Sequence, residues 1–97
     1  MRMLLKAQLD VSKANEALKD GSLQKAFESI MEKLNPEAAY FTVEDGKRTA
    51  LIVFDLADPS QMPVAAEPLF QAVDAAVDFT PVMTEDDLQK GLQQALG

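Results

Sequence analysis

Apolar and polar residues alternate along residues 38–56 in the pattern of two paired strands. Asp45-Gly46 separates the two runs and favours a type I′ turn, because this dipeptide tolerates positive φ at both central positions. Such a turn fixes the register, so we expect Glu44 to face Lys47. The run Leu51-Ile52-Val53-Phe54 is apolar throughout, which is typical of a central strand covered on both faces. The second strand of this hairpin is therefore expected to be central, and the first to lie nearer an edge.

The chain before the hairpin has one strand pattern and two helix patterns. Residues 2–9 alternate and predict a strand. Apolar residues then recur at helical spacing, but the stripe changes phase at Gly21. We expect a short helix capped by Asp10 or Ser12, a break, and a helix over 22–34 that ends at Asn35-Pro36. The break is either a functional hinge or a bend that lets the helix follow a curved sheet.

A helix and a strand are expected after the hairpin. Asp58-Pro59 predicts a helix start, with Asp58 as N-cap and Pro59 at the first helical position. Pro63 and Pro68 should each kink this segment, so it forms either one helix or two short helical turns. Residues 76–83 alternate again, and Pro81 indicates an edge strand or the end of a strand.

Three consecutive carboxylates begin the last segment. Thr84-Glu85-Asp86-Asp87 resembles a capping box before a helix that carries Leu88 and Leu92. Acidic residues also suit the positive end of a helix dipole. A carboxylate metal site is the alternative, but the spacing of a calcium loop is missing. We expect a helix cap and no metal.

The order of elements predicts an α+β fold. Strand, helix, strand, strand, helix, strand is the ferredoxin-like βαββαβ pattern, here with an extra C-terminal helix, in a single domain over residues 1–97. Both main helices should cover one face of an antiparallel sheet. The other face would expose Leu51 and Val53, which are too apolar to remain in water. We expect two sheets to pack face to face in a homodimer, or in a higher oligomer, with a half-polar cavity between them.

Composition excludes several classes of function. The net charge is −7 and the pI about 4.4, which disfavours binding to nucleic acid or to an anionic membrane. There is no cysteine, histidine or tryptophan, so the chain forms no disulfide and no thiolate zinc site. No apolar run is long enough to span a membrane, and Lys6 interrupts the apolar start before a signal sequence forms. We expect a cytoplasmic protein without a cofactor.

The whole length resembles the dimeric α/β-barrel superfamily, which includes antibiotic-biosynthesis-monooxygenase-like and muconolactone-isomerase-like proteins and many domains of unknown function. The resemblance is carried by residues 2–9, by YFTVEDGKRTALIVFDL, by DPSQM opening a helix and by VDFTPVMT before the last helix. It implies the fold and the dimer. Members that bind haem usually need a histidine, and the monooxygenase members use a tryptophan and asparagine set. This sequence matches neither requirement.

The polar residues that we expect to bind a ligand lie on the open face of the expected sheet. The predicted ligand-binding residues are Lys6, Gln8, Tyr40, Thr42, Asp55 and Asp78. Tyrosine and lysine beside carboxylates can act as acid and base where burial shifts their pKa values. Each residue also has a structural interpretation: Tyr40 as an interface aromatic, Asp55 as a strand-end residue or helix cap, and Lys6 or Arg2 in an ion pair with Asp55 or Asp78.

Two functions follow from this arrangement. The first is the binding of a small organic ligand, with or without catalysis, in a cleft at the dimer interface. The alternative is a non-catalytic structural or interaction module whose dimer interface is closed. Catalytic residues are not predicted, because no serine has a histidine to activate it and no glycine-rich phosphate loop is present.

Overall fold

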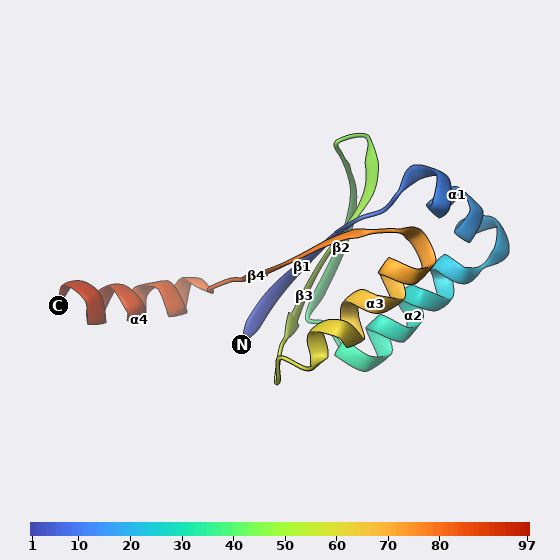
Figure 1. Cartoon of the computed structure of the whole chain (residues 1–97). Coiled ribbons are helices and arrows are strands. Elements are labelled where there is room, and N and C mark those ends of the chain that lie inside the picture. Colours follow the sequence, from blue (N-terminus) through green and yellow to red (C-terminus); the bar gives the residue numbers. More distant parts are fainter.

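Four antiparallel strands form one sheet, and helices cover one of its faces (Figure 1). The computed structural model describes all residues from Met1 to Gly97. The elements in chain order are β1 (Arg2–Gln8), α1 (Val11–Asp20), α2 (Ser22–Leu34), β2 (Ala38–Glu44), β3 (Lys47–Asp55), α3 (Gln61–Val73), β4 (Ala76–Pro81) and α4 (Glu85–Leu96). The architecture is α+β and is compatible with a ferredoxin-like fold that carries an additional C-terminal helix.

The hairpin of β2 and β3 has the expected turn and register. Asp45 and Gly46 have φ angles of 55° and 73°, the positive values that a type I′ turn requires. Glu44 lies opposite Lys47, and Tyr40 lies opposite Leu51. The strand order is β2-β3-β1-β4, so β3 is central and β2 is an edge strand, as the sequence predicts.

The two N-terminal helices also follow the sequence closely. The Asp10 carboxylate accepts a hydrogen bond from the backbone N–H of Lys13 (3.0 Å) and caps α1, whereas Ser12 lies inside the helix. Gly21 separates α1 from α2 with a φ of 84°, a left-handed conformation that glycine adopts at little cost. Asn35 ends α2 in the same left-handed region. The expected strand over 2–9 stops at Gln8.

The start of α3 differs from the sequence expectation. Asp58 and Pro59 form a turn ahead of the helix, which begins at Gln61, and the Asp58 carboxylate accepts the backbone N–H of Ser60 at 3.0 Å. Asp58 therefore caps a turn instead of the helix. Pro63 is the third helical residue, where the missing N–H would have no partner inside the helix.

Pro68 lies within α3 and does not divide it into two turns. The proline removes the hydrogen bond that the carbonyl of Val64 would normally accept. Val64 is exposed, so water is available to this carbonyl instead. The helix is consequently continuous from Gln61 to Val73.

The core lies between the sheet and the helices α1, α2 and α3. Side chains from the inner faces of β1 and β3 meet Ile30 of α2 and Leu69 of α3, and these two helices lie side by side (Figure 1). Phe54 is fully buried and meets Phe79 of β4 edge to face, with 6.4 Å between ring centroids. The inner face of the sheet is thus the expected one.

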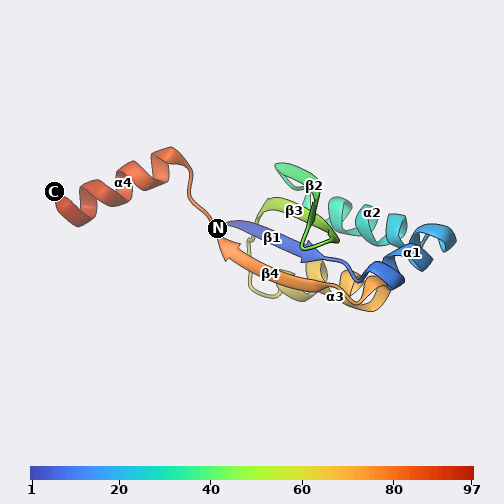
Figure 2. The same ribbon diagram turned by 90° about the horizontal axis from the view of Figure 1, so that it is seen from above.

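The strand β4 is the second edge of the sheet and ends at Pro81, two residues before the expected end. The helix α4 then projects away from the body (Figures 1 and 2). None of its residues is buried. The Cα radius of gyration is 15.3 Å, whereas about 12.5 Å is typical for a folded chain of this length. Within one copy of the chain, α4 covers neither the open face nor an edge strand.

Replacing Phe54 with alanine should test the core. The cavity left by this fully buried ring should lower the free energy of unfolding by about 3–5 kcal/mol. Urea titration followed by circular dichroism measures the loss. Phe70→Ala is the matched control, because Phe70 is 40% exposed, and it should lower the free energy of unfolding by less than Phe54→Ala does. Equal losses in both variants would contradict the assignment of the core.

Candidate functional site

The structure places all six predicted site residues on the open face of the sheet. Tyr40, Leu51, Lys6 and Asp78 form one continuous row across the four strands. Thr42 and Gln8 belong to the next row, and Asp55 stands near the opposite end of the sheet. The residues are therefore brought to one surface but are spread over its whole width.

The ion pairs on this face differ from those expected. The Lys6 ammonium pairs with Glu44, not with Asp55 or Asp78, and the hydrogen bond to Glu44 raises the pKa of Lys6. Arg2 donates to Glu37 at 2.5 Å, which raises the pKa of the guanidinium. Lys47 lies opposite Glu44 on the neighbouring strand, but the Glu44 carboxylate forms its ion pair with Lys6. The paired Lys6 is thus held as a cation on a surface that water reaches.

Two other polar residues of this face, Asp55 and Gln8, also have structural partners. The Met1 amino group donates to Asp55 at 2.7 Å, and the Gln8 amide donates to Asp45 at 3.2 Å. Tyr40 is exposed. Asp55 therefore anchors the first residue of the chain, as a strand-end residue can, and does not cap a helix.

An apolar centre lies among these polar residues. Leu4 faces Val53 across β1 and β3, and Leu51 follows two residues before Val53 on the same side. All three are half-buried. No pocket lies on this face within one copy, so the predicted cleft requires a second sheet and stays a prediction.

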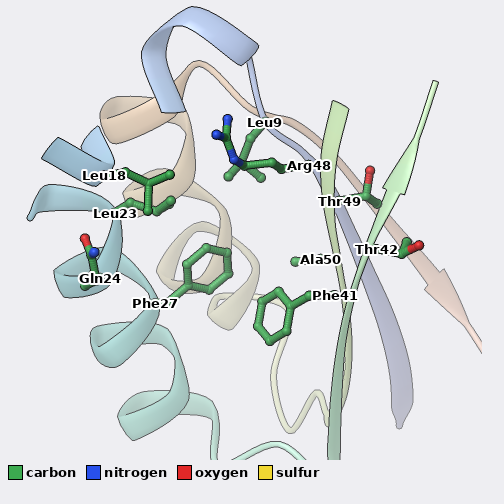
Figure 3. A pocket seen from close by; sticks show the side chains of 10 residues that line it. All are labelled: Leu9, Leu18, Leu23, Gln24, Phe27, Phe41, Thr42, Arg48, Thr49 and Ala50. Carbon is green, nitrogen blue, oxygen red and sulfur yellow. The ribbon is translucent and has the colours of Figure 1, made fainter. Parts of the chain in front are cut away.

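The pocket that the structure does contain lies on the opposite side of the sheet, between the helices and the hairpin (Figure 3). Its volume is about 390 Å³, within the range of roughly 300–1,000 Å³ for small-molecule sites. Ten residues line it: Leu9, Leu18, Leu23, Gln24, Phe27, Phe41, Thr42, Arg48, Thr49 and Ala50. Thr42 is the one predicted site residue among them, and its side chain points away from the helices in Figure 3.

Two aromatic rings form the centre of this pocket. Phe27 of α2 meets Phe41 of β2 edge to face, with 5.6 Å between ring centroids (Figure 3). Phe41 nevertheless remains 62% exposed, because β2 is an edge strand and no helix lies over this part of it. The pocket therefore has apolar walls on the helix side and is open along β2.

Arg48 supplies the only charge in the lining. Its side chain lies at the same end of the pocket as Leu9 (Figure 3), and its guanidinium donates to the Asn15 amide oxygen at 2.9 Å. None of the four ion pairs in the structure includes Arg48. The lining contains no carboxylate. An apolar pocket with one guanidinium that lacks a carboxylate partner is suited to an amphipathic anion.

Sequence reasoning missed this pocket because its residues come from four separate elements. One signal was available: Phe41 lies on the inner face of a strand expected near an edge, where few residues remain to cover it. The position of Arg48 opposite Val43, on the same inner face, is a second signal. Neither reveals the pocket until the position of α1 and α2 over the sheet is known.

The acidic cluster of α4 caps its helix, as the sequence predicts. The Thr84 hydroxyl accepts the backbone N–H of Asp87 at 3.2 Å, and the Asp87 carboxylate accepts the backbone N–H of Thr84 at 3.1 Å. This pair of bonds is a capping box. The backbone hydrogen bond from Thr84 is the main cause that lowers the pKa of Asp87.

Comparison with protein-family models and with curated proteins found no match. No helix of the structure has the length and hydrophobicity needed to cross a membrane.

Acidification should uncap α4. The pKa of Asp87 is lower in the folded chain than the value of about 3.9 for a free aspartate, so the cap is fully present above that value. Its contribution disappears as the pH falls through the lowered pKa. Backbone chemical shifts of residues 85–96, recorded from about pH 6 to about pH 2, should show α4 losing helicity in that range. Asp87→Asn should remove the transition and Asp86→Asn should keep it. The same transition in both variants would contradict the role of Asp87.

Proposed function

We propose that the protein binds a small amphipathic ligand with one anionic group in the pocket between α1, α2 and the hairpin. One observation carries this proposal: Arg48 is a cation without a carboxylate partner in a lining that is otherwise uncharged and mostly apolar. In a chain of net charge −7, carboxylates are abundant, and none lines this pocket. An incoming anion would find one guanidinium and two aromatic rings, Phe27 and Phe41.

The chemistry of the lining supports binding more than catalysis. It offers hydroxyl, amide and guanidinium groups, with no histidine, cysteine or carboxylate to act as a base or nucleophile. Hydrogen bonds from Arg48 would orient the anionic group, and the phenylalanines would hold the apolar part. A binding or carrier function for a small organic molecule in the cytoplasm is the resulting proposal.

We also propose that two copies pack through their open sheet faces, as in the dimeric α/β-barrel proteins that the sequence resembles. The half-exposed centre of Leu4, Leu51 and Val53 supports this, because a neighbouring sheet would remove it from water. The interface would then enclose Lys6, Gln8, Tyr40, Thr42, Asp55 and Asp78 in a cleft. That cleft is the second candidate ligand site. A closed interface without a ligand would match the alternative of a structural module.

Arg48→Met should weaken the binding of an apolar anion. Anilinonaphthalene sulfonate is a suitable fluorescent probe, and phenylnaphthylamine is its neutral analogue without the sulfonate. The lost charge-assisted hydrogen bond should raise the dissociation constant of the anionic probe about tenfold and leave that of the neutral probe nearly unchanged. Lys25→Met, which removes an exposed lysine and changes the net charge equally, is the control and should bind both probes normally.

The two candidate sites give different results in the same titration. Tyr40→Phe and Lys6→Met alter the open face and leave the pocket lining intact, so binding in the pocket should not change. Weaker probe binding in these two variants, with normal binding in Arg48→Met, would place the ligand in the interface cleft and contradict the pocket proposal.

Val53→Glu should dissociate the proposed dimer. The substitution places a carboxylate at the centre of each open face, and burying this charge in both copies should weaken association at least a hundredfold, or about 3 kcal/mol. Size-exclusion chromatography with light scattering measures the mass. Val64→Glu adds the same charge on the exposed side of α3 and should leave the dimer intact. A Val53→Glu protein that stays dimeric would rule out the sheet-face interface.

A further inference from the structure

The helix α4 has an apolar stripe in which no side chain is buried within its own chain. Leu88, Leu92 and Leu96 recur every four residues and therefore lie along one side of the helix. They are 45%, 48% and 84% exposed. Isolated helices of this length are marginal in water, since most helical stability in proteins comes from packing of the apolar side. The stripe therefore requires a partner surface.

The strand β2 presents a second unpartnered apolar surface, beside the mouth of the pocket. Phe41 and Val43 stand on its inner side and are 62% and 71% exposed, and Leu18 of α1 borders the same opening. Phe41 and Val43 are about 6.7 Å apart along the strand. The leucine stripe of α4 extends for about 12 Å. A helix laid along β2 can therefore cover both side chains, in the manner of an amphipathic helix in an apolar groove.

In the structure, α4 of the same chain does not lie on this surface and projects away from the body (Figures 1 and 2). The backbone N–H of Val82 donates to the Arg2 carbonyl (3.2 Å), so α4 leaves the sheet beside the first residue of β1. The pocket lies beyond the other end of β1, at Leu9, and on the side of β2, the opposite edge from β4. The seven residues of β1 span about 20 Å and the three strand spacings about 14 Å. The connection from Val82 to Thr84 spans at most about 11 Å. To bring its stripe onto β2 of the same chain, α4 would have to turn back across the sheet from the direction that it takes in Figures 1 and 2.

We infer that α4 of one copy lies across β2 and the pocket mouth of a second copy, with its leucine stripe on Phe41 and Val43. The contact is reciprocal in a two-fold dimer, so both stripes and both β2 surfaces are covered. Charge permits the approach, because α4 begins with three acidic residues whereas the pocket lining has no carboxylate and one arginine. The partner helix then closes the pocket along its open side. This assignment rests on the proposed dimer but not on the identity of the ligand.

Cross-linking of single-cysteine variants tests this assignment, because the natural chain contains no cysteine. Leu92→Cys and Val43→Cys proteins of different tag length are mixed and treated with a short bismaleimide. The expected product is a covalent heterodimer with one chain of each variant. Leu92→Cys mixed with Val64→Cys, an exposed position on α3, is the control and should give no such product.

A double variant with both Leu92→Cys and Val43→Cys separates the two possible origins of the contact. Cross-linked dimers support the exchange between copies, whereas an internally linked monomer at low protein concentration overturns it. Two further results also overturn the assignment. In the first, Leu92→Cys gives as much heterodimer with Val64→Cys as with Val43→Cys. In the second, Leu92→Cys and Val43→Cys give no heterodimer although light scattering still shows a dimer. In the last case the sheet-face dimer and probe binding at Arg48 persist, so the failure concerns α4 alone.

Discussion

The fold depends on covering a central strand, β3, that is apolar on both faces. Its inner residues Ala50, Ile52 and Phe54 lie beneath the helices and are almost completely buried. Its outer residues Leu51 and Val53 remain only half-buried, because all three helices of the body lie on the inner side. The helices thus bury the inner face of the sheet and stabilise the fold, but the apolar residues of the outer face remain partly exposed.

The helical layer leaves the hairpin end of β2 uncovered, and this explains the pocket. The helices α2 and α3 lie side by side on the inner face of the sheet, but Phe41 and Val43 of β2 remain 62% and 71% exposed. The distal part of β2 lies beyond this layer, so the space between Phe27 and Phe41 is filled only in part. The one pocket of the structure therefore lies beside the edge strand that the helices do not cover. In the same place Arg48 lies beside apolar side chains of the lining and makes no ion pair with a carboxylate.

The sequence was sufficient for features that depend on neighbouring residues. The Asp45-Gly46 turn, the break at Gly21 and the capping box at Thr84 are set by local backbone preferences, and the structure has all three. The start of α3 was predicted wrongly, because Asp58-Pro59 suits a turn as well as a helix N-terminus. The local pattern does not decide between these two structures.

Features that depend on tertiary contacts were predicted less well. The Lys6 ammonium pairs with Glu44, which lies at the hairpin end of β2, two strands away from β1. The register of the strands alone does not identify this pair. The pocket requires the positions of α1 and α2 over β2, which no spacing in the sequence specifies. The open face was assigned correctly, since its residues follow from strand alternation alone, but the role of this face in binding a ligand stays a prediction.

The exposed edge at β2 also has a consequence for the solubility of the protein. The segment Ala38–Val43 has high β propensity, contains no proline and carries no charge, which is the composition of a strand that can recruit further strands and aggregate. Glu37 and Glu44 flank it as charged gatekeepers, and the net charge of −7 adds repulsion between chains. Near the pI of about 4.4 that repulsion vanishes. Colloidal stability should therefore be lowest in acidic solution near the pI.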